Sequence, residues 1–349
     1  MTAPNDASST RHRFDELRLA AYLADHLPRF SGPLTVRQFQ GGQSNPTYLL
    51  TTPTQRFVMR SKPGPVERLL PSAHAIEREF RIMRALGAQG LPVPQMHLLV
   101  EDESVIGRAF YVMEHVEGRI FWNPTLPELG PTERGEIYDE MNRVLAALHA
   151  VDPQAAGLSD FGKAGNYFTR QIGRWSKQYV ASETETIEAM NRLIAWLPEH
   201  VPQGDEVAVV HGDYRLDNLI FHPTEPRVVA MLDWELSTLG HPLADLSYQC
   251  IAWHIPPGGF RGIGGLDLAA LGIPSEADYI ARYCERTGRS SIAHWDFYLA
   301  YNLFRIAAIL QGVYRRATEG MASSDNALET GKNVRALAEL GWSFAQRAG

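Results

Sequence analysis

The sequence has little of what would place a protein outside the cell or in a membrane. Only two of its 349 residues are cysteines, Cys250 and Cys284, and their spacing fits neither a disulfide framework nor a metal site. No apolar run is long enough to cross a bilayer, and residues 1–13 are polar, without the apolar core of a signal peptide. We therefore expect a disordered tail at residues 1–13, a cytoplasmic protein and no membrane partner.

An excess of positive charge is also missing. The chain has 33 Lys and Arg against 40 Asp and Glu, a net charge of −7. Proteins that bind nucleic acid carry a basic surface, so this balance predicts no nucleic-acid partner. The charged fraction of 21% is ordinary for a globular chain, and composition leaves the oligomeric state open.

The most informative feature is an ordered set of acidic and amide side chains in the second half of the chain. Asp213 and Asn218 lie in the run His-Gly-Asp-Tyr-Arg-Leu-Asp-Asn, and Asp233 follows a β-rich stretch. Phosphoryl transfer needs a carboxylate beside the acceptor hydroxyl, and oxygen ligands that hold Mg²⁺ against the phosphates. The pattern predicts Asp213 as the catalytic residue and Asn218 with Asp233 as the Mg²⁺ ligands.

This pattern resembles the aminoglycoside phosphotransferase and choline kinase family, a small-molecule branch of the protein-kinase-like fold. The likeness rests on residues 211–218, on the Asp-Trp-Glu of residues 233–235, and on the Gly-x-Pro-x-x-Asp-Leu-like segment at residues 240–246. It implies ATP and Mg²⁺ as cofactors. It also implies a two-lobed α+β fold with a small antiparallel β lobe and a mainly helical lobe.

Hydrophobic periodicity supports this division. We expect residues 14–117 to form an N-terminal nucleotide-binding lobe, and residues 118–349 a C-terminal helical lobe with the catalytic loop and substrate site. In the first lobe the pattern predicts strands over residues 34–40, 48–51, 57–59, 95–100 and 109–115, with helices over 14–27 and 72–89. In the second it predicts helices over 132–149, 168–179, 185–197, 277–286, 295–315 and 327–345, and strands over 207–210, 219–222 and 228–232.

Two segments of the first lobe are predicted to bind nucleotide through the backbone. The turn after the first strand has small residues that would let N–H groups approach phosphates, although a plain hairpin turn also favours glycine. Its predicted contacts are Gly41, Gly42, Ser44 and Asn45. The hinge from Glu114 to Val116 would offer backbone groups to adenine.

The third strand departs from the usual kinase pattern. Kinases place Lys here, whereas this chain has Arg60, and strand alternation puts Lys62 on the same face. Either residue could hold the phosphates; we expect Arg60, paired with Glu79, with Glu77 as the rival partner. Arg at this position, together with residues 70–74 and 78–80, resembles a branch of the family associated with acyl-CoA dehydrogenases.

Four further residues are predicted to support the site. His211 would hold the catalytic loop by hydrogen bonding, and Asp217 would cap it. Asp245 either braces the loop or caps the helix that follows Pro242, and Glu235 either adds an outer contact to the metal or faces solvent.

Together these features predict a Mg²⁺- and ATP-dependent phosphotransferase that acts on a small-molecule hydroxyl. The branch resemblance implies a hydroxyacyl-CoA or related hydroxy acid as acceptor. The basic stripe of Arg170, Arg174 and Lys177 could meet such an anion, or could face water. An aminoglycoside or amino-alcohol kinase, an unusual protein kinase and a non-catalytic nucleotide-binding module remain alternatives, and the choice between ATP and GTP stays open.

Overall fold

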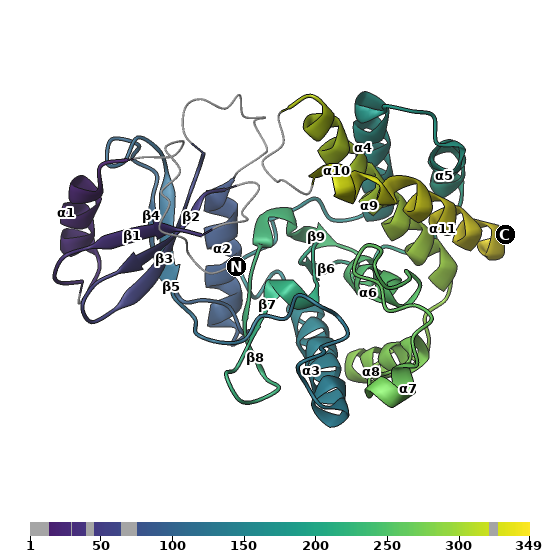
Figure 1. Cartoon of the computed structure of the whole chain (residues 1–349), viewed down its shortest axis with the longest axis horizontal. Coiled ribbons are helices and arrows are strands. Elements are labelled where there is room, and N and C mark those ends of the chain that lie inside the picture. Colours follow the sequence, from purple (N-terminus) through teal and green to yellow (C-terminus); the bar gives the residue numbers. More distant parts are fainter. Residues whose placement is uncertain (1–13, 29, 40–44, 64–74, 321–326) are drawn as a thin grey trace. The chain divides into compact units, whose positions relative to one another are not determined.

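The computed structural model describes residues 14–28, 30–39, 45–63, 75–320 and 327–349. The chain divides into two compact units, one of Met1–Ile120 with Leu219–Leu236, and one of Phe121–Asn218 with Ser237–Gly349. Figure 1 gives the order of the elements along the chain. The predicted tail at residues 1–13 and the predicted helix start at Ser72 lie outside the described residues.

The first unit is built on a five-stranded antiparallel sheet in the order β1-β2-β3-β5-β4. Its elements are α1 (Glu16–His26), β1 (Thr35–Gln38), β2 (Thr47–Thr51), β3 (Arg56–Ser61), α2 (Ile76–Ala88), β4 (Met96–Val100) and β5 (Phe110–Glu114). Each strand falls within about two residues of its predicted range. The α+β class is therefore confirmed in this half of the chain.

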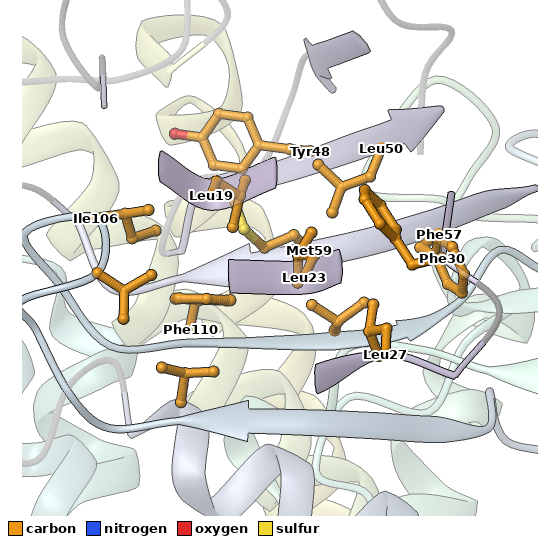
Figure 2. Close-up of a cluster of buried hydrophobic side chains, with 13 residues drawn as sticks. Leu19, Leu23, Leu27, Phe30, Tyr48, Leu50, Phe57, Met59, Ile106 and Phe110 are labelled. Carbon is orange, nitrogen blue, oxygen red and sulfur yellow. The ribbon is translucent and has the colours of Figure 1, made fainter. Parts of the chain in front are cut away.

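The two helices of this unit cover opposite faces of the sheet. Leu19 and Leu23 of α1 pack into a buried cluster with Phe110 of β5, and Figure 2 shows the α1 leucines over the strands. The next residue of the strand, Tyr111, must point to the other face because side chains alternate along a strand. There its ring lies 6.2 Å from that of Phe80 on α2.

A hairpin from much later in the chain completes the first unit. Strands β7 (Leu219–Phe221) and β8 (Val228–Met231) pair antiparallel. Arg119 and Phe221 exchange two backbone hydrogen bonds of 2.8 Å, and the Met231 N–H donates to the carbonyl of Pro92 at 2.8 Å. Gly118 permits this approach, since a Cβ there would lie 2.2 Å from the Phe221 carbonyl oxygen.

The second unit is mainly helical. Its helices are α3 (Pro131–His149), α4 (Tyr167–Ser182), α5 (Glu188–Glu199), α6 (Leu243–Cys250), α7 (Leu268–Leu271), α8 (Glu276–Thr287), α9 (Trp295–Thr318), α10 (Ala327–Gly331) and α11 (Asn333–Ala348). Helix α9 is buried on most of its surface and packs against α4, α6 and α11, so it forms the centre of this unit. Among the helices of the described ranges, none is both long and apolar enough to span a membrane.

Three parts of this unit differ from the sequence expectation, and one of them is the short helix α7, which the pattern did not predict. A single helix was expected over residues 327–345, but α10 ends at Gly331 and α11 begins at Asn333. Close packing against α9 accompanies this break, because a Cβ on Gly331 would lie 2.2 Å from the ring of Tyr314. The pattern also missed β9 (Thr238–Gly240), which pairs with β6 (Ala208–Val210). Three residues are too few for alternation to reveal a strand.

Candidate active site

The first unit collects charged side chains around Arg60 on β3. The Arg60 Nε lies 3.0 Å from Oε2 of Glu79, and its Nη2 lies 3.4 Å from Asp233 Oδ1 and 3.3 Å from Glu235 Oε2. The predicted pairing of Arg60 with Glu79 is therefore present. The rival carboxylate, Glu77, instead pairs with Lys62.

Glu79 is held on several sides inside the unit. Its side chain is 3% exposed, and its two oxygens accept hydrogen bonds from Asn45 Nδ2 at 2.9 Å and Tyr111 Oη at 3.0 Å. Burial raises the pKa of the Glu79 carboxyl, and the positive charge of Arg60 opposes this rise. Burial alone would lower the pKa of Arg60, but Glu79 and the other nearby acids hold it above its ordinary value. Arg60 is thus a permanent, rigidly oriented cation.

Asp233 has an unusual backbone conformation. Its φ angle is +65°, in the left-handed region that residues other than glycine seldom adopt. It comes two residues after β8, in the short link before a 3₁₀ turn at Trp234–Leu236. Strained backbone of this kind persists where the surrounding structure enforces it, as it does at many functional sites. Here Trp234 anchors the turn, since it is buried and its Nε1 donates to the carbonyl of Met231 at 3.0 Å.

The predicted hinge lines a cavity of about 320 Å³ in the first unit. Its walls include Glu114, Val116 and the apolar side chains of Val58, Ile220 and Leu232. The Glu114 carboxylate accepts from the Gln95 N–H at 3.1 Å and is thereby engaged in the fold. Within the described ranges, no hydrogen bond involves the backbone N–H of Val116. Of the turn predicted to cover phosphates, Asn45 bonds to Glu79, and Gly41, Gly42 and Ser44 lie outside the described residues.

The second unit carries the His-Gly-Asp loop directly after β6. Here Asp245 of α6 accepts from the backbone N–H of His211 at 2.6 Å and of Gly212 at 2.9 Å. It therefore braces the loop, and it does not cap α6, whose N-cap residue is Pro242. His211 also supports the loop, because its Nδ1 accepts from the Asp213 N–H at 3.2 Å.

The Asp213 carboxylate is held at both oxygens. Asn218 Nδ2 donates to Asp213 Oδ2 at 3.0 Å and to its backbone carbonyl at 2.9 Å. Arg215 Nε lies 3.2 Å from the same Oδ2, and Tyr248 Oη donates to Oδ1 at 2.7 Å. Thus the structure brings the predicted Asp213 and Asn218 together in this unit. Asp233 lies with Arg60 and Glu79 in the other unit.

A largely apolar cavity of about 50 Å³ lies beside this loop, and Tyr248 is part of its lining. Its basic residues are Arg215 and Arg261, and Asp217 pairs with Arg261 at 2.8 Å and with Arg215 at 3.5 Å. The stripe of Arg170, Arg174 and Lys177 does not line it. Arg170 instead donates to the carbonyl of Lys163, and the guanidinium of Arg174 lies 5.0 Å from the ring of Trp175.

Sequence reasoning missed several side chains that contact this site, among them Tyr248, Arg215 and Arg261. Tyr248 follows the bracing Asp245 by three residues on α6, a spacing that places both on one helix face, so this signal was available. Arg215 lies within the loop itself. Arg261 comes from a distant segment between helices, and no local pattern connects it with Asp217.

Comparison with known proteins identifies the family of this chain. The model of the phosphotransferase enzyme family matches residues 35–298. The chain belongs to this family. The family assignment and the kinase-like α+β fold expected from the sequence are both confirmed.

The similar proteins fall into two groups. A candidate aminoglycoside phosphotransferase from Ralstonia eutropha JMP134 is 58% identical, with a TM-score of 0.88, and the match covers 96% of this chain and 99% of that one. Spectinomycin phosphotransferase, solved with ADP and spectinomycin, is 14% identical with a TM-score of 0.63 over 95% of this chain and 98% of its own, a likeness of fold alone.

Relatives that carry a dehydrogenase name match nearly the whole chain. Acyl-CoA dehydrogenase family member 10 of Mus musculus is 51% identical over 321 residues, which make up 91% of this chain and 30% of that protein. The chain spans 30% to 44% of the lengths of the first curated relatives it matches. The resemblance to the branch associated with acyl-CoA dehydrogenases is thereby confirmed.

The role of Asp245 in bracing the loop can be tested by the pH dependence of stability. Burial alone would raise the pKa of Asp245, but hydrogen bonding and charge from His149, with the Gly212 N–H, hold it below its ordinary value. The resulting stability is present above the ordinary pKa of Asp and is lost as pH falls through the lowered one. We expect Asp245→Asn to reduce the free energy of unfolding by about 2–4 kcal/mol at neutral pH.

Urea unfolding at a series of pH values measures this effect. The difference between wild type and Asp245→Asn should narrow as pH falls below about 4. Asp25→Asn, a change at an exposed position on α1, should follow the wild type throughout. A difference that stays constant down to the acid-unfolding range would contradict the assigned role of Asp245.

Proposed function

We propose that the protein is a Mg²⁺- and ATP-dependent phosphotransferase that moves the γ-phosphate to the hydroxyl of a small molecule. The observation that carries this proposal is the arrangement of Asp213 and Asn218 in one braced loop. Asn218 donates through its amide nitrogen to Asp213, and this fixes the carboxylate next to Tyr248, a residue that lines the small cavity beside the loop. Asp213 orients the acceptor hydroxyl and takes its proton.

The residues predicted to bind Mg²⁺ have suitable chemistry. Because the Asn218 amide nitrogen donates to Asp213, its carbonyl oxygen is left to face a cation. In the part of the chain that the structure describes, Asp233 is paired with Arg60 through Oδ1 only, so Oδ2 can act as a ligand. Hard oxygen donors of this kind suit Mg²⁺, which keeps several waters and phosphate oxygens in its shell. When bound, the ion supplies charge neutralisation on the phosphates.

In the proposed site Arg60 holds the phosphates, and Lys62 does not. Glu79 fixes Arg60 through its Nε, while the Nη2 of the guanidinium points to Asp233 and Glu235. Arginine can grip phosphate oxygens through two parallel N–H groups. The turn of Gly41, Gly42, Ser44 and Asn45 covers the phosphates in this proposal, and Glu235 supports the metal from outside its ligand shell.

The hinge cavity is proposed to take the adenine ring. Its lining includes the apolar side chains of Val58, Ile220 and Leu232, against which a base can pack. The N–H of Val116 is available to hydrogen-bond the ring edge, beside the carbonyl groups of the hinge from Glu114 to Val116. This proposal also keeps the predicted boundary between an N-terminal nucleotide-binding lobe of residues 14–117 and a C-terminal lobe of residues 118–349.

The acceptor is proposed to be neutral or anionic, a hydroxyacyl-CoA or related hydroxy acid. The cavity beside Asp213 is mostly apolar, and its charged residues are Arg215, Arg261 and Asp217, the last already paired with both arginines. A polycationic aminoglycoside would require a surplus of carboxylates instead. The dehydrogenase names of the relatives point the same way.

The cell context is proposed from composition and structure together. Both cysteines, Cys250 and Cys284, are free and buried, which fits a reducing cytoplasm. We propose no nucleic-acid and no membrane partner.

Two variants test the catalytic and metal roles. Asp213→Asn should leave Mg·ATP affinity largely intact and lower kcat by about 10² or more, because the proton acceptor is lost. Asp233→Ala should abolish turnover and also weaken Mg²⁺-dependent ATP binding. Isothermal titration with and without Mg²⁺, beside a phosphate-transfer assay, separates the two. Normal Mg²⁺-dependent affinity in Asp233→Ala would reject the metal assignment, and binding without turnover by the wild type would favour a non-catalytic module.

A matched pair of substitutions tests the phosphate clamp. Arg60→Met and Lys62→Met each remove one positive charge, the first near the end of β3 and the second just beyond it. We expect Arg60→Met to weaken ATP binding by about 1.5–3 kcal/mol, the range for a charged hydrogen bond, and Lys62→Met to have a much smaller effect. ATP and AMP titrations measure both, since AMP lacks the outer phosphates. A larger loss in Lys62→Met would reverse the assignment.

A competition between acceptor classes tests the substrate proposal. Short and long hydroxyacyl-CoAs and free hydroxy acids should be phosphorylated, whereas kanamycin-type aminoglycosides should not, because the cavity has no free cluster of acids. Steady-state kcat/KM for each compound, measured with ATP and again with GTP, is the readout. Efficient aminoglycoside turnover without any hydroxyacyl-CoA turnover would overturn the proposed acceptor class.

A further inference from the structure

Tyr248 connects the catalytic loop with the wall of the acceptor cavity. Its hydroxyl donates to Asp213 Oδ1 at 2.7 Å, and its ring is part of the cavity lining. The guanidinium of Arg305 lies 5.3 Å from this ring and also donates to the carbonyl of Gly212, one residue before Asp213. One buried arginine thus fixes both the tyrosine and the loop that it contacts.

The contacts of the Asp213 carboxylate are unequal. Oδ2 faces both Asn218 Nδ2 at 3.0 Å and Arg215 Nε at 3.2 Å. Among the described residues, Oδ1 has a polar contact with Tyr248 alone. A carboxylate offers about four lone-pair positions, two on each oxygen. The open position is therefore on Oδ1, next to the tyrosine hydroxyl.

We propose that Tyr248 is a positioning residue for phosphoryl transfer, which sets the rotation of the Asp213 carboxylate so that Oδ1 receives the acceptor hydroxyl. This inference rests on the function proposed above and names the atom involved. In the transfer step the acceptor O–H proton passes to Oδ1 and an O–P bond forms to the γ-phosphorus. The bond from that phosphorus to the bridging oxygen breaks, and its electron pair leaves on ADP.

The hydroxyl of Tyr248 suits this role chemically. Burial raises its pKa above the ordinary value, and the adjacent Asp213 charge raises it further. The tyrosine therefore stays protonated at all physiological pH values and acts as a hydrogen-bond donor to Asp213. It does not compete with Asp213 as a base.

Tyr248→Phe tests the inference, because it removes the hydroxyl and keeps the ring. Tyr214→Phe is a matched control: Tyr214 is also buried, and its hydroxyl donates at the same 2.7 Å, but to the backbone carbonyl of Met141. We expect kcat for transfer to the hydroxyacyl-CoAs and hydroxy acids named above to fall about 10- to 100-fold in Tyr248→Phe, by misplacement of the base. The Kd of Mg·ATP should stay within about twofold of the wild-type value.

The ratio of the rate of acceptor phosphorylation to the rate of ATP hydrolysis does not depend on the fraction of folded protein. Under the proposed function the wild type should transfer phosphate to the acceptor and, more slowly, to water, and partial unfolding would lower both rates equally. A misplaced Asp213 should lower acceptor transfer more than ATP hydrolysis, so the ratio should fall in Tyr248→Phe and be unchanged in Tyr214→Phe. An unchanged kcat or ratio in Tyr248→Phe overturns the inference and leaves the proposed function standing. A wild type that neither phosphorylates an acceptor nor hydrolyses ATP overturns both.

Discussion

The buried carboxylate of Asp245 is the constraint on which the His-Gly-Asp loop depends. Two consecutive backbone N–H groups, of His211 and Gly212, donate to its two oxygens, and the φ angle of +82° at Gly212 makes this convergence possible. From the other side Arg305 binds the Gly212 carbonyl. Burying a charge is costly unless donors surround it, and here the donors belong to the loop that must be held. The position of Asp213 therefore depends on this brace as well as on the direct contacts of its own carboxylate.

The cluster around Arg60 has the opposite electrostatic character. One guanidinium faces three carboxylates, those of Glu79, Asp233 and Glu235, so the group has a formal charge of −2. Glu79 is buried and fully engaged, whereas Asp233 and Glu235 are about one-third exposed. Excess negative charge at a partly open site is an environment that favours a divalent cation. In the proposed function the bound cation would offset the repulsion between this cluster and the phosphates.

The sequence pattern predicted residues correctly where a motif position has a single known role. The order of Asp213, Asn218 and Asp233 indicated the family, and the kinase-like position of Arg60 on the third strand indicated Glu79 of the following helix as its partner. It could not decide the role of Asp245, since an acid in the first turn of a helix is equally suited to capping that helix. Only the position of Pro242 at the N-cap, with Asp245 directed to the loop, separates the two. Arg261 was beyond reach, because its contact with Asp217 joins segments whose proximity is a result of the whole fold.

The first unit is made of two separate stretches of chain, and this has a consequence for synthesis. Its sheet is complete at Glu114, yet the hairpin that contacts Arg119 and Pro92 ends only at Met231. A ribosome must therefore make more than a hundred further residues, including all of α3, α4 and α5, before that unit can close. During this interval Ile120 and Val116 lack the apolar partners Ile220 and Leu232 that later cover them. The nascent protein thus exposes the apolar side chains of its hinge region until the β7–β8 hairpin has been made.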